Sequence, residues 1–207
     1  GDVGTEGMVA GPSEICVLAD GKTDLNQVIT SMIGQAEHDV NSQCILITKD
    51  KKLVNKFNNE IKRRIQKVQR KSVVLKSLKN NGLIVFAQTD KQIIEAINEV
   101  APEHLEINVS NYKKYLDQIY NAGSIMIGKY SPMAVSDYNV GTNHVLPTLG
   151  SAKFSSGLNS SEFYKKISHI TLTKKGIEKL GESATHLAEY EDLDNHAQSI
   201  RSRMKGK

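Results

Sequence analysis

Three short stretches of the sequence concentrate side chains that can transfer protons or bind a metal. They are QAEHD at Gln35–Asp39, APEHL at Ala101–Leu105 and SDYNVGTNHVLPT at Ser136–Thr148. In the last stretch, Asp137 and His144 are each a candidate metal ligand or base. Gly141 and Pro147 interrupt it, and neither helical nor strand periodicity fits, so we interpret it as an ordered irregular loop. The alternative is an ordinary surface loop with a helix cap.

The other two stretches add different chemistry. Gln35 and His38 are three residues apart in the last turn of a predicted helix, so they occupy neighbouring positions on one face. Glutamine is an uncommon ligand, which makes this a weak metal pattern by itself. Glu103 and His104 could supply a base and an acid in one place. Taken singly, each of these histidines is more often structural than chemical.

Composition limits the classes of protein to which the chain can belong. The 207 residues are 39% hydrophobic and 24% charged, as in a globular protein of one or two domains. No run approaches the roughly eighteen apolar residues of a membrane span, and no secretory signal is visible. Cys16 and Cys44 lie inside apolar runs, which predicts small buried hydrophobes in a reducing compartment. We therefore expect a cytoplasmic protein without a membrane partner.

The charge pattern gives little support to nucleic-acid binding. The net charge is +4, which is compatible with anionic ligands. A basic stretch lies on the polar face of a predicted helix and contains no interleaved aromatic residues: Lys62, Arg63, Arg64, Lys67, Arg70 and Lys71. We interpret it as a solvated helix face rather than a nucleic-acid patch.

The elements that position these residues alternate along the chain. Five apolar runs predict strands at 14–19, 44–48, 82–87, 105–109 and 124–127. Amphipathic segments between them predict helices, with Asp24 and Asp90 as caps and with one helix over 53–68. Short connections favour βαβ units and a mainly parallel, Rossmann-like sheet, which is an α/β fold. Ligands of such sheets collect at the carboxyl ends of the strands, and the Ser136 loop follows the last predicted strand. We therefore expect the site at the carboxyl edge of the sheet.

After this loop the sequence changes character. Ser155–Gly157 resembles a flexible joint, so we predict an α/β domain over 1–157 and a helical arm over 158–207. Within the arm we expect a short helix at Phe163–Lys166, a strand at Ile167–Thr173 and then two helices. An arm beside a compact domain often packs on a partner subunit.

The motifs together carry a resemblance to a known family. In order along the chain they are AGPSE at 10–14, QAEHD at 35–39, APEHLE at 101–106, AGSIMIG at 122–128, DYNVGTNHVLPT at 137–148, FSSGL at 154–158 and EDLDNHAQSIRSR at 191–203. This set closely resembles the histidinol dehydrogenase family of histidine biosynthesis, over about Ala10 to Arg203. The resemblance implies an NAD-dependent, zinc-dependent oxidation of L-histidinol through histidinal to L-histidine.

The resemblance also implies roles for residues of this chain. The family's zinc ligands match Gln35, His38, Asp137 and His196, and its catalytic pair matches Glu103 and His104. His104 would be the general base, and Glu103 would activate the water that attacks the aldehyde. Substrate contacts would come from the zinc ligands and His104, together with Ser13, His144 and Glu191. The resemblance implies a homodimer with shared sites, in which the arm brings Glu191 and His196 to the partner.

Two departures from the family pattern leave an alternative open. The chain resembles only the C-terminal half of the family's polypeptide, and no G-x-G-x-x-G follows a strand, so no residue is assigned to NAD. Ser136 stands where the family usually has glycine, and a positive φ there would strain the backbone. The alternative is a truncated homologue that binds zinc or an imidazole ligand but is inactive alone.

Overall fold

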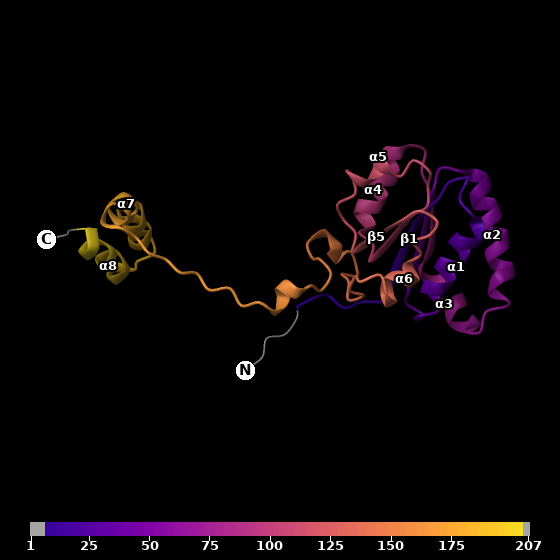
Figure 1. The fold of residues 1–207 in the computed structure, drawn as a ribbon, viewed down its shortest axis with the longest axis horizontal. Helices are drawn as coiled ribbons and strands as arrows, with labels where there is room; N and C mark the ends of the chain where they lie inside the picture. The colour runs from indigo at the N-terminus through magenta and orange to yellow at the C-terminus, as the bar shows by residue number, and fades with distance from the viewer. Residues whose placement is uncertain (1–6, 205–207) are drawn as a thin grey trace. The chain divides into compact units, whose positions relative to one another are not determined.

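The computed structural model describes residues 7–204, and contacts divide the chain into two compact units between Phe163 and Tyr164. The first unit is a sheet with helices on both of its faces (Figure 1). The second unit is helical. The predicted joint at Ser155–Gly157 lies within the first unit, and the domains 1–157 and 158–207 remain a prediction.

The sheet of the first unit has five strands, and all of its pairings are parallel. The strands are β1 (Glu14–Leu18), β2 (Gln43–Thr48), β3 (Gly82–Phe86), β4 (His104–Ile107) and β5 (Ser124–Ile127). Their order is β3-β2-β1-β4-β5, so β1 is central and pairs with β2 and β4. This confirms the predicted α/β fold with a parallel, Rossmann-like sheet.

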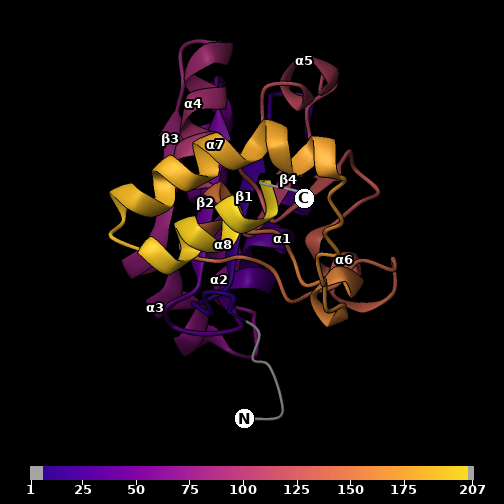
Figure 2. The same cartoon turned by 90° about the vertical axis from the view of Figure 1, so that its left-hand side faces the viewer.

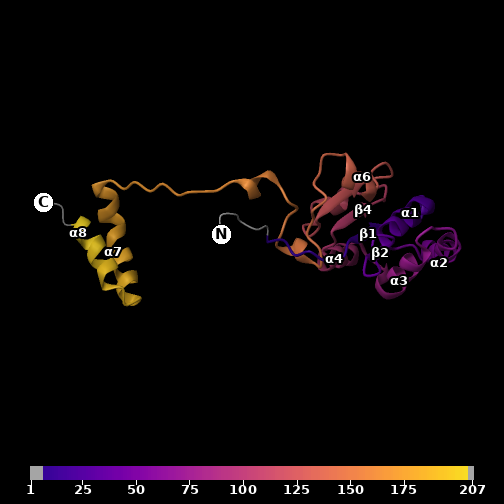
Figure 3. The same ribbon diagram turned by 90° about the horizontal axis from the view of Figure 1, so that it is seen from below.

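Helices cover both faces of the sheet (Figure 3). One face packs against α1 (Leu25–Ala36), α2 (Lys51–Ile65), α3 (Lys71–Asn81) and α6 (Met133–Tyr138). The other packs against α4 (Asp90–Val100) and α5 (Lys113–Leu116). Because side chains alternate along a strand, Ile15 and Val17 pack in the core on the α1 side of the sheet, and Cys16 and Leu18 pack in the core on the α4 side.

Several local expectations are confirmed and others are wrong. Asp24 caps α1, because its side chain accepts a hydrogen bond from the N–H of Asn26 at 2.9 Å. Asp90 does not cap α4: Thr89 accepts the hydrogen bond from the N–H of Gln92, while the Asp90 carboxylate accepts from Lys49, Lys114 and Tyr115. The single helix predicted over 53–68 ends at Ile65, and an additional helix, α3, follows.

The second unit is a pair of helices, α7 (Lys174–Tyr190) and α8 (Asp194–Met204), which lie side by side (Figure 2). They approach closely at Gly181, where a Cβ atom would lie 2.4 Å from the Met204 sulfur. The helix predicted at Phe163–Lys166 is wrong, because a 3-10 helix ends at Phe163 instead. The strand predicted at Ile167–Thr173 is also wrong: these residues are extended without a pairing partner in the described structure. Within the part of the chain that the structure describes, no helix combines the length and the apolarity needed to cross a membrane.

The core prediction concerns Leu105, which is fully buried in β4. Leu105→Ala should lower the free energy of unfolding by about 2–5 kcal/mol, because it removes packed methyl groups and leaves a cavity. Urea unfolding measures this change. Leu83→Ala is the matched control, since Leu83 is 51% exposed on the edge strand β3 and should change stability by no more than about 0.5 kcal/mol. Equal losses in the two variants would contradict this assignment of the core.

Candidate active site

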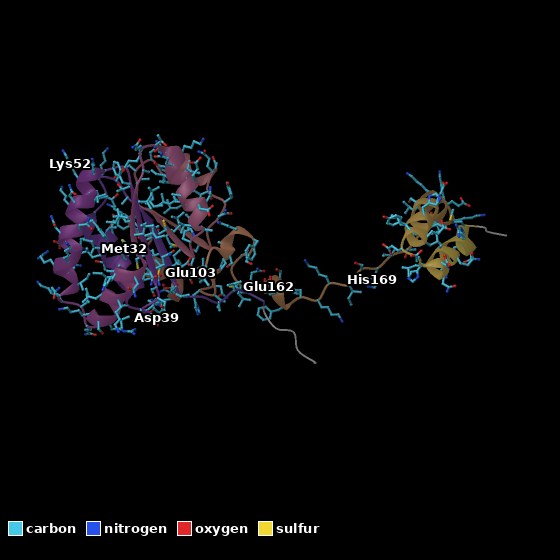
Figure 4. All side chains as sticks on the ribbon, turned by 180° about the vertical axis from the view of Figure 1, so that it is seen from behind. Met32, Asp39, Lys52, Glu103, Glu162 and His169 are labelled. Carbon is cyan, nitrogen blue, oxygen red and sulfur yellow. The ribbon has the colours of Figure 1, made fainter. Side chains whose placement is uncertain are left out.

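The candidate site lies at the amino edge of the sheet. Ser13 immediately precedes β1, and Glu103 precedes β4, which begins at His104. Helix α1 returns to the same edge, with Gln35 in its last turn and His38 just beyond its end. In Figure 4, Glu103 and Asp39 lie towards one end of the unit, and Lys52, which follows β2, lies towards the opposite end. The expectation of a site at the carboxyl edge is therefore wrong.

A pocket of about 430 Å³ unites most of the predicted site residues. Its lining consists of Ser13, Gln35, His38, Glu103, His104, Asp137, Tyr138 and His144. Glu191 and His196 belong to the second unit, where Glu191 ends α7 and His196 lies in α8. The first unit thus assembles seven of the nine predicted residues in one place.

Two buried glutamates join the starts of β1 and β4. The N–H of Glu14 donates to Oε2 of Glu103 at 2.8 Å, and the N–H of Glu103 donates to Oε2 of Glu14 at 3.2 Å. Each side chain therefore accepts a hydrogen bond from the other residue's backbone. Burial raises the pKa of Glu14, as does the charge of Glu103, while the N–H groups of Leu149 and Glu103 oppose the rise.

His104 is held with one ring nitrogen fixed and the other without a hydrogen bond. Its Nδ1 lies 3.1 Å from the carbonyl oxygen of Glu14, which can only accept, so Nδ1 is the donor. Nε2 is buried without a hydrogen-bond partner and lies 3.3 Å from Oδ1 of Asp137. Burial lowers the pKa of His104, but the carboxylates of Glu103 and Asp137 outweigh it, and the net shift is upward. When the ring is neutral, its proton is on Nδ1 and Nε2 is free to accept a proton, and the raised pKa makes the ring a stronger base.

Asp137 reaches this site on a helix rather than on an irregular loop. It lies in α6, so the prediction of non-helical structure is wrong at the start of the Ser136–Thr148 stretch. At the first residue of α6, the N–H of Met133 donates to Oε1 of buried Glu106 at 2.7 Å. Ser136 has no positive φ, and its hydroxyl donates to the carbonyl of Met133 at 2.7 Å, so serine is not strained there.

The segment Leu146–Leu149, here called the strap, closes the loop that carries His144. The hydroxyl of Thr148 donates to the carbonyl of Val9 at 3.0 Å, and the N–H of Leu149 donates to Oε1 of Glu14 at 3.0 Å. Leu149 has a left-handed φ of 55°. Gly123 lies between the strap and Glu103. A Cβ atom at Gly123 would be 3.2 Å from Cδ of Pro147 and 2.6 Å from the carbonyl oxygen of Glu103, so the strap and Glu103 lie close together.

The unsatisfied side-chain amide of Gln35 favours a bound group at this site. Its side chain is fully buried, and neither its amide nitrogen nor its amide oxygen has a hydrogen-bond partner. Buried polar atoms are nearly always satisfied, so this amide needs a further partner. His38 and Asp137 line the same pocket and offer an imidazole and a carboxylate, which fit zinc.

The described residues contain no cluster of three or more His, Cys, Asp and Glu side chains arranged to hold a metal. The predicted ligand set includes a glutamine, and its fourth member, His196, belongs to the second unit. Cys16 and Cys44 are buried as expected, and burial raises the pKa of each thiol to about 12. Both thiols therefore remain protonated and are unsuitable as metal ligands.

Sequence reasoning missed two carboxylates that organise this site, Glu14 and Glu106. Glu14 holds Glu103 and the strap, and Glu106 holds the start of α6. The available signal was an acidic residue inside an otherwise apolar strand, because a buried charge requires dedicated partners. Tyr138 also lines the pocket but is 85% exposed.

Comparison with known proteins gives a consistent result. The profile of the family described as histidinol dehydrogenase matches residues 1–204. The chain is 51% identical to a histidinol dehydrogenase of Pelagibacter ubique over 207 residues, covering all of this chain and 48% of that protein. It is 41% identical to one of Listeria monocytogenes over 198 residues, covering 96% of this chain and 46% of that protein.

A solved structure supports the same relationship. The crystal structure of histidinol dehydrogenase from Elizabethkingia anophelis matches with a TM-score of 0.86 and 35% identity. The match covers 96% of this chain and 46% of that one. The chain therefore spans about half the length of the relatives it matches.

The buried carboxyl of Glu106 predicts a pH dependence of stability. Burial raises its pKa above 4.5, although the N–H of Met133 opposes the rise. The native state then binds more protons than the unfolded state, so this contribution to stability is present below about pH 4.5 and is lost as the pH rises through the native pKa. The unfolding free energy of the unaltered chain minus that of Glu106→Gln should fall as the pH rises. Urea unfolding between about pH 4.5 and 8 measures it, and a difference that rises with pH would contradict the assignment.

Proposed function

The chain belongs to the histidinol dehydrogenase family, and we propose that it carries the zinc-binding and acid–base residues for the NAD-linked oxidation of L-histidinol through L-histidinal to L-histidine. The observation that carries this proposal is the state of His104. Its Nδ1–H is donated to the Glu14 carbonyl. Its Nε2, which makes no hydrogen bond, lies 3.3 Å from Oδ1 of Asp137 in a pocket that Glu103 also lines. This arrangement suits a general base that acts on a hydroxyl group.

The proposed chemistry uses His104 and Glu103 in turn. In the first oxidation, Nε2 of His104 accepts the proton of the substrate hydroxyl, while the adjacent carbon gives up its hydrogen as hydride. Glu103 then takes a proton from the water that attacks the aldehyde. Once His104 has released its first proton to solvent, it accepts a hydroxyl proton of the hydrate while the carbon gives up a second hydride. The product is the carboxylic acid, which loses its remaining proton to solvent and becomes the carboxylate. The hydride acceptor in both oxidations would be NAD⁺, for which no residue of this chain is assigned.

The remaining residues bind and orient the substrate. We assign Gln35, His38 and Asp137 as zinc ligands, with His196 as the fourth, because they provide the nitrogen and oxygen donors that zinc accepts. Zinc, when bound, supplies a positive charge that orients the substrate's imidazole and amine. Ser13, His144 and Glu191 would make further substrate contacts.

A second candidate function follows from the length of the chain, which spans about half of the matched relatives. In this alternative, the chain binds zinc and an imidazole ligand but does not turn over alone. Two measurements on the purified chain separate these functions: NADH formation with L-histidinol, NAD⁺ and Zn²⁺, and metal analysis for bound zinc. Turnover favours the enzyme, and zinc binding without turnover favours the binding protein.

We further propose a homodimer with shared sites, in which Glu191 and His196 complete the site of the partner. The second unit presents several exposed apolar side chains that a dimer interface would bury, such as Leu180 at 52% and Leu187 at 65% exposure. Since His196 lies in that unit, zinc binding would be linked to association.

Replacement of His104 tests the catalytic assignment. His104→Asn should lower turnover by roughly 10²–10⁴-fold, the usual contribution of a general base, while zinc content and substrate affinity stay nearly unchanged. The assay can use a chimera in which this chain replaces the matching segment of the Pelagibacter ubique relative. His169→Asn is the matched control, because His169 is exposed on the extended segment of Figure 4. A fall in zinc content equal to the fall in rate would show that the role is misassigned.

A mixing experiment tests the shared metal site. Neither His38→Ala nor His196→Ala should hold stoichiometric zinc, because each lacks an imidazole ligand. Mixed in equal amounts, they should form heterodimers in which one of the two sites regains all of its ligands. Because random reassortment makes about half of the dimers mixed, metal analysis of the mixture should recover about one quarter of the normal zinc. Heterodimers without restored zinc would show that His196 acts within its own subunit.

A further inference from the structure

We propose that Glu14 is a positioning residue that couples the His144 loop to the Glu103–His104 pair. The inference rests on the proposed function for the roles of those residues, but the coupling itself is a property of the fold. Glu14 is 5% exposed at the first position of β1. Its hydrogen bonds lead to two segments far from it in sequence, the start of β4 and the strap.

The side chain of Glu14 uses its two oxygens separately. Oε2 accepts the N–H of Glu103 at 3.2 Å, and Oε1 accepts the N–H of Leu149 at 3.0 Å. A carboxylate can satisfy both donors at once because both of its oxygens accept. A glutamine offers only one acceptor, so its NH₂ group would face one of the two N–H groups. Glutamate therefore suits this position better than glutamine, because both of its side-chain oxygens face N–H donors.

The backbone of Glu14 completes the connection. Its N–H holds Oε2 of Glu103 at 2.8 Å, and its carbonyl accepts from Nδ1 of His104 at 3.1 Å. The same residue thus orients the carboxylate of Glu103 and fixes the tautomer of His104. A shift of Glu14 would move both catalytic candidates together.

The strap links Glu14 to the loop that carries His144. Gly11 allows close approach, because a Cβ atom there would lie 2.6 Å from Cγ of Leu149. Pro147 packs against Gly123 beside the carbonyl of Glu103. His144 lies two residues before Leu146, where the strap begins, and it lines the same pocket as Glu103 and His104. The bond from Leu149 to Glu14 therefore limits how far the loop can move from the pair.

Amide hydrogen exchange on the purified chain tests the coupling without metal, substrate or NAD. In Glu14→Ala, the amides of Glu103 and Leu149 should both exchange at least about tenfold faster, because both lose their acceptor. In Glu14→Gln, which keeps the volume, only one of the two amides should lose protection. Unchanged protection of both amides in Glu14→Ala would overturn the proposal. If Glu14→Ala does not fold, Glu14→Gln decides, and retention of both amides there would likewise overturn it.

Asn98→Ala is the matched control. Asn98 is also buried, and its Oδ1 accepts two backbone N–H groups, from Tyr120 at 3.0 Å and Asn121 at 3.2 Å. The Asn98→Ala substitution should accelerate exchange at the amides of Tyr120 and Asn121 and leave those of Glu103 and Leu149 protected. This comparison separates a specific coupling from general destabilisation.

Turnover of the chimera provides the functional readout. The Glu14 variants should lower kcat by roughly 10- to 100-fold, as expected for catalytic groups displaced by about 1 Å, and should change KM for L-histidinol by a smaller factor. Asn98→Ala should keep the normal kcat. A normal kcat in Glu14→Ala would overturn the positioning role while leaving the proposed function intact. If the unaltered chimera shows no turnover, the proposed function fails, and hydrogen exchange alone decides the coupling.

Discussion

The structure of this site depends on the reciprocal hydrogen bonds between Glu14 and Glu103. Two carboxylates buried side by side would repel each other, and each would lose its hydration. Here each carboxylate accepts a hydrogen bond from the other residue's backbone N–H. The N–H groups of Glu14, at the start of β1, and of Glu103, just before β4, thus compensate for the lost hydration. The arrangement also brings the Glu14 carbonyl to Nδ1 of His104. A requirement of strand pairing thereby orients Glu103 and His104, the pair proposed to be catalytic.

This constraint explains why the candidate site lies at the amino edge of a Rossmann-like sheet. Helix α1 runs back along the sheet and delivers Gln35 and His38 to that edge. Helix α6 delivers Asp137 to His104, and its first N–H is held by Glu106. His104 and Glu106 are two apart in β4, so they project from the same face of the sheet, towards α1 and α6. Most residues of the candidate site therefore come from helices and from the starts of strands, and His144 comes from the loop after α6.

The sequence predicted the sheet well, because buried parallel strands appear as apolar runs with a clear spacing. It predicted α1 and α4 from strong apolar stripes, whereas α3 was missed because its buried face includes Ser77 beside Val74. Seven of the nine predicted site residues share one pocket, but their location was mispredicted. The general rule for parallel sheets places ligands at the carboxyl edge, and no local pattern shows that α6 turns back. Glu14 was overlooked because its role depends on Leu149, which is distant in sequence.

Locating the bound ligand on the sheet tests most directly whether the site lies at the amino edge. Amide chemical shifts of the labelled chain can be followed during titration with L-histidinol in the presence of Zn²⁺. A ligand bound at the candidate site should shift amide signals at the amino edge, around Ser13, His38, Glu103 and the strap. Shifts clustered instead at the carboxyl edge, around Asn26, Asn108 and Lys129, would contradict this location of the site.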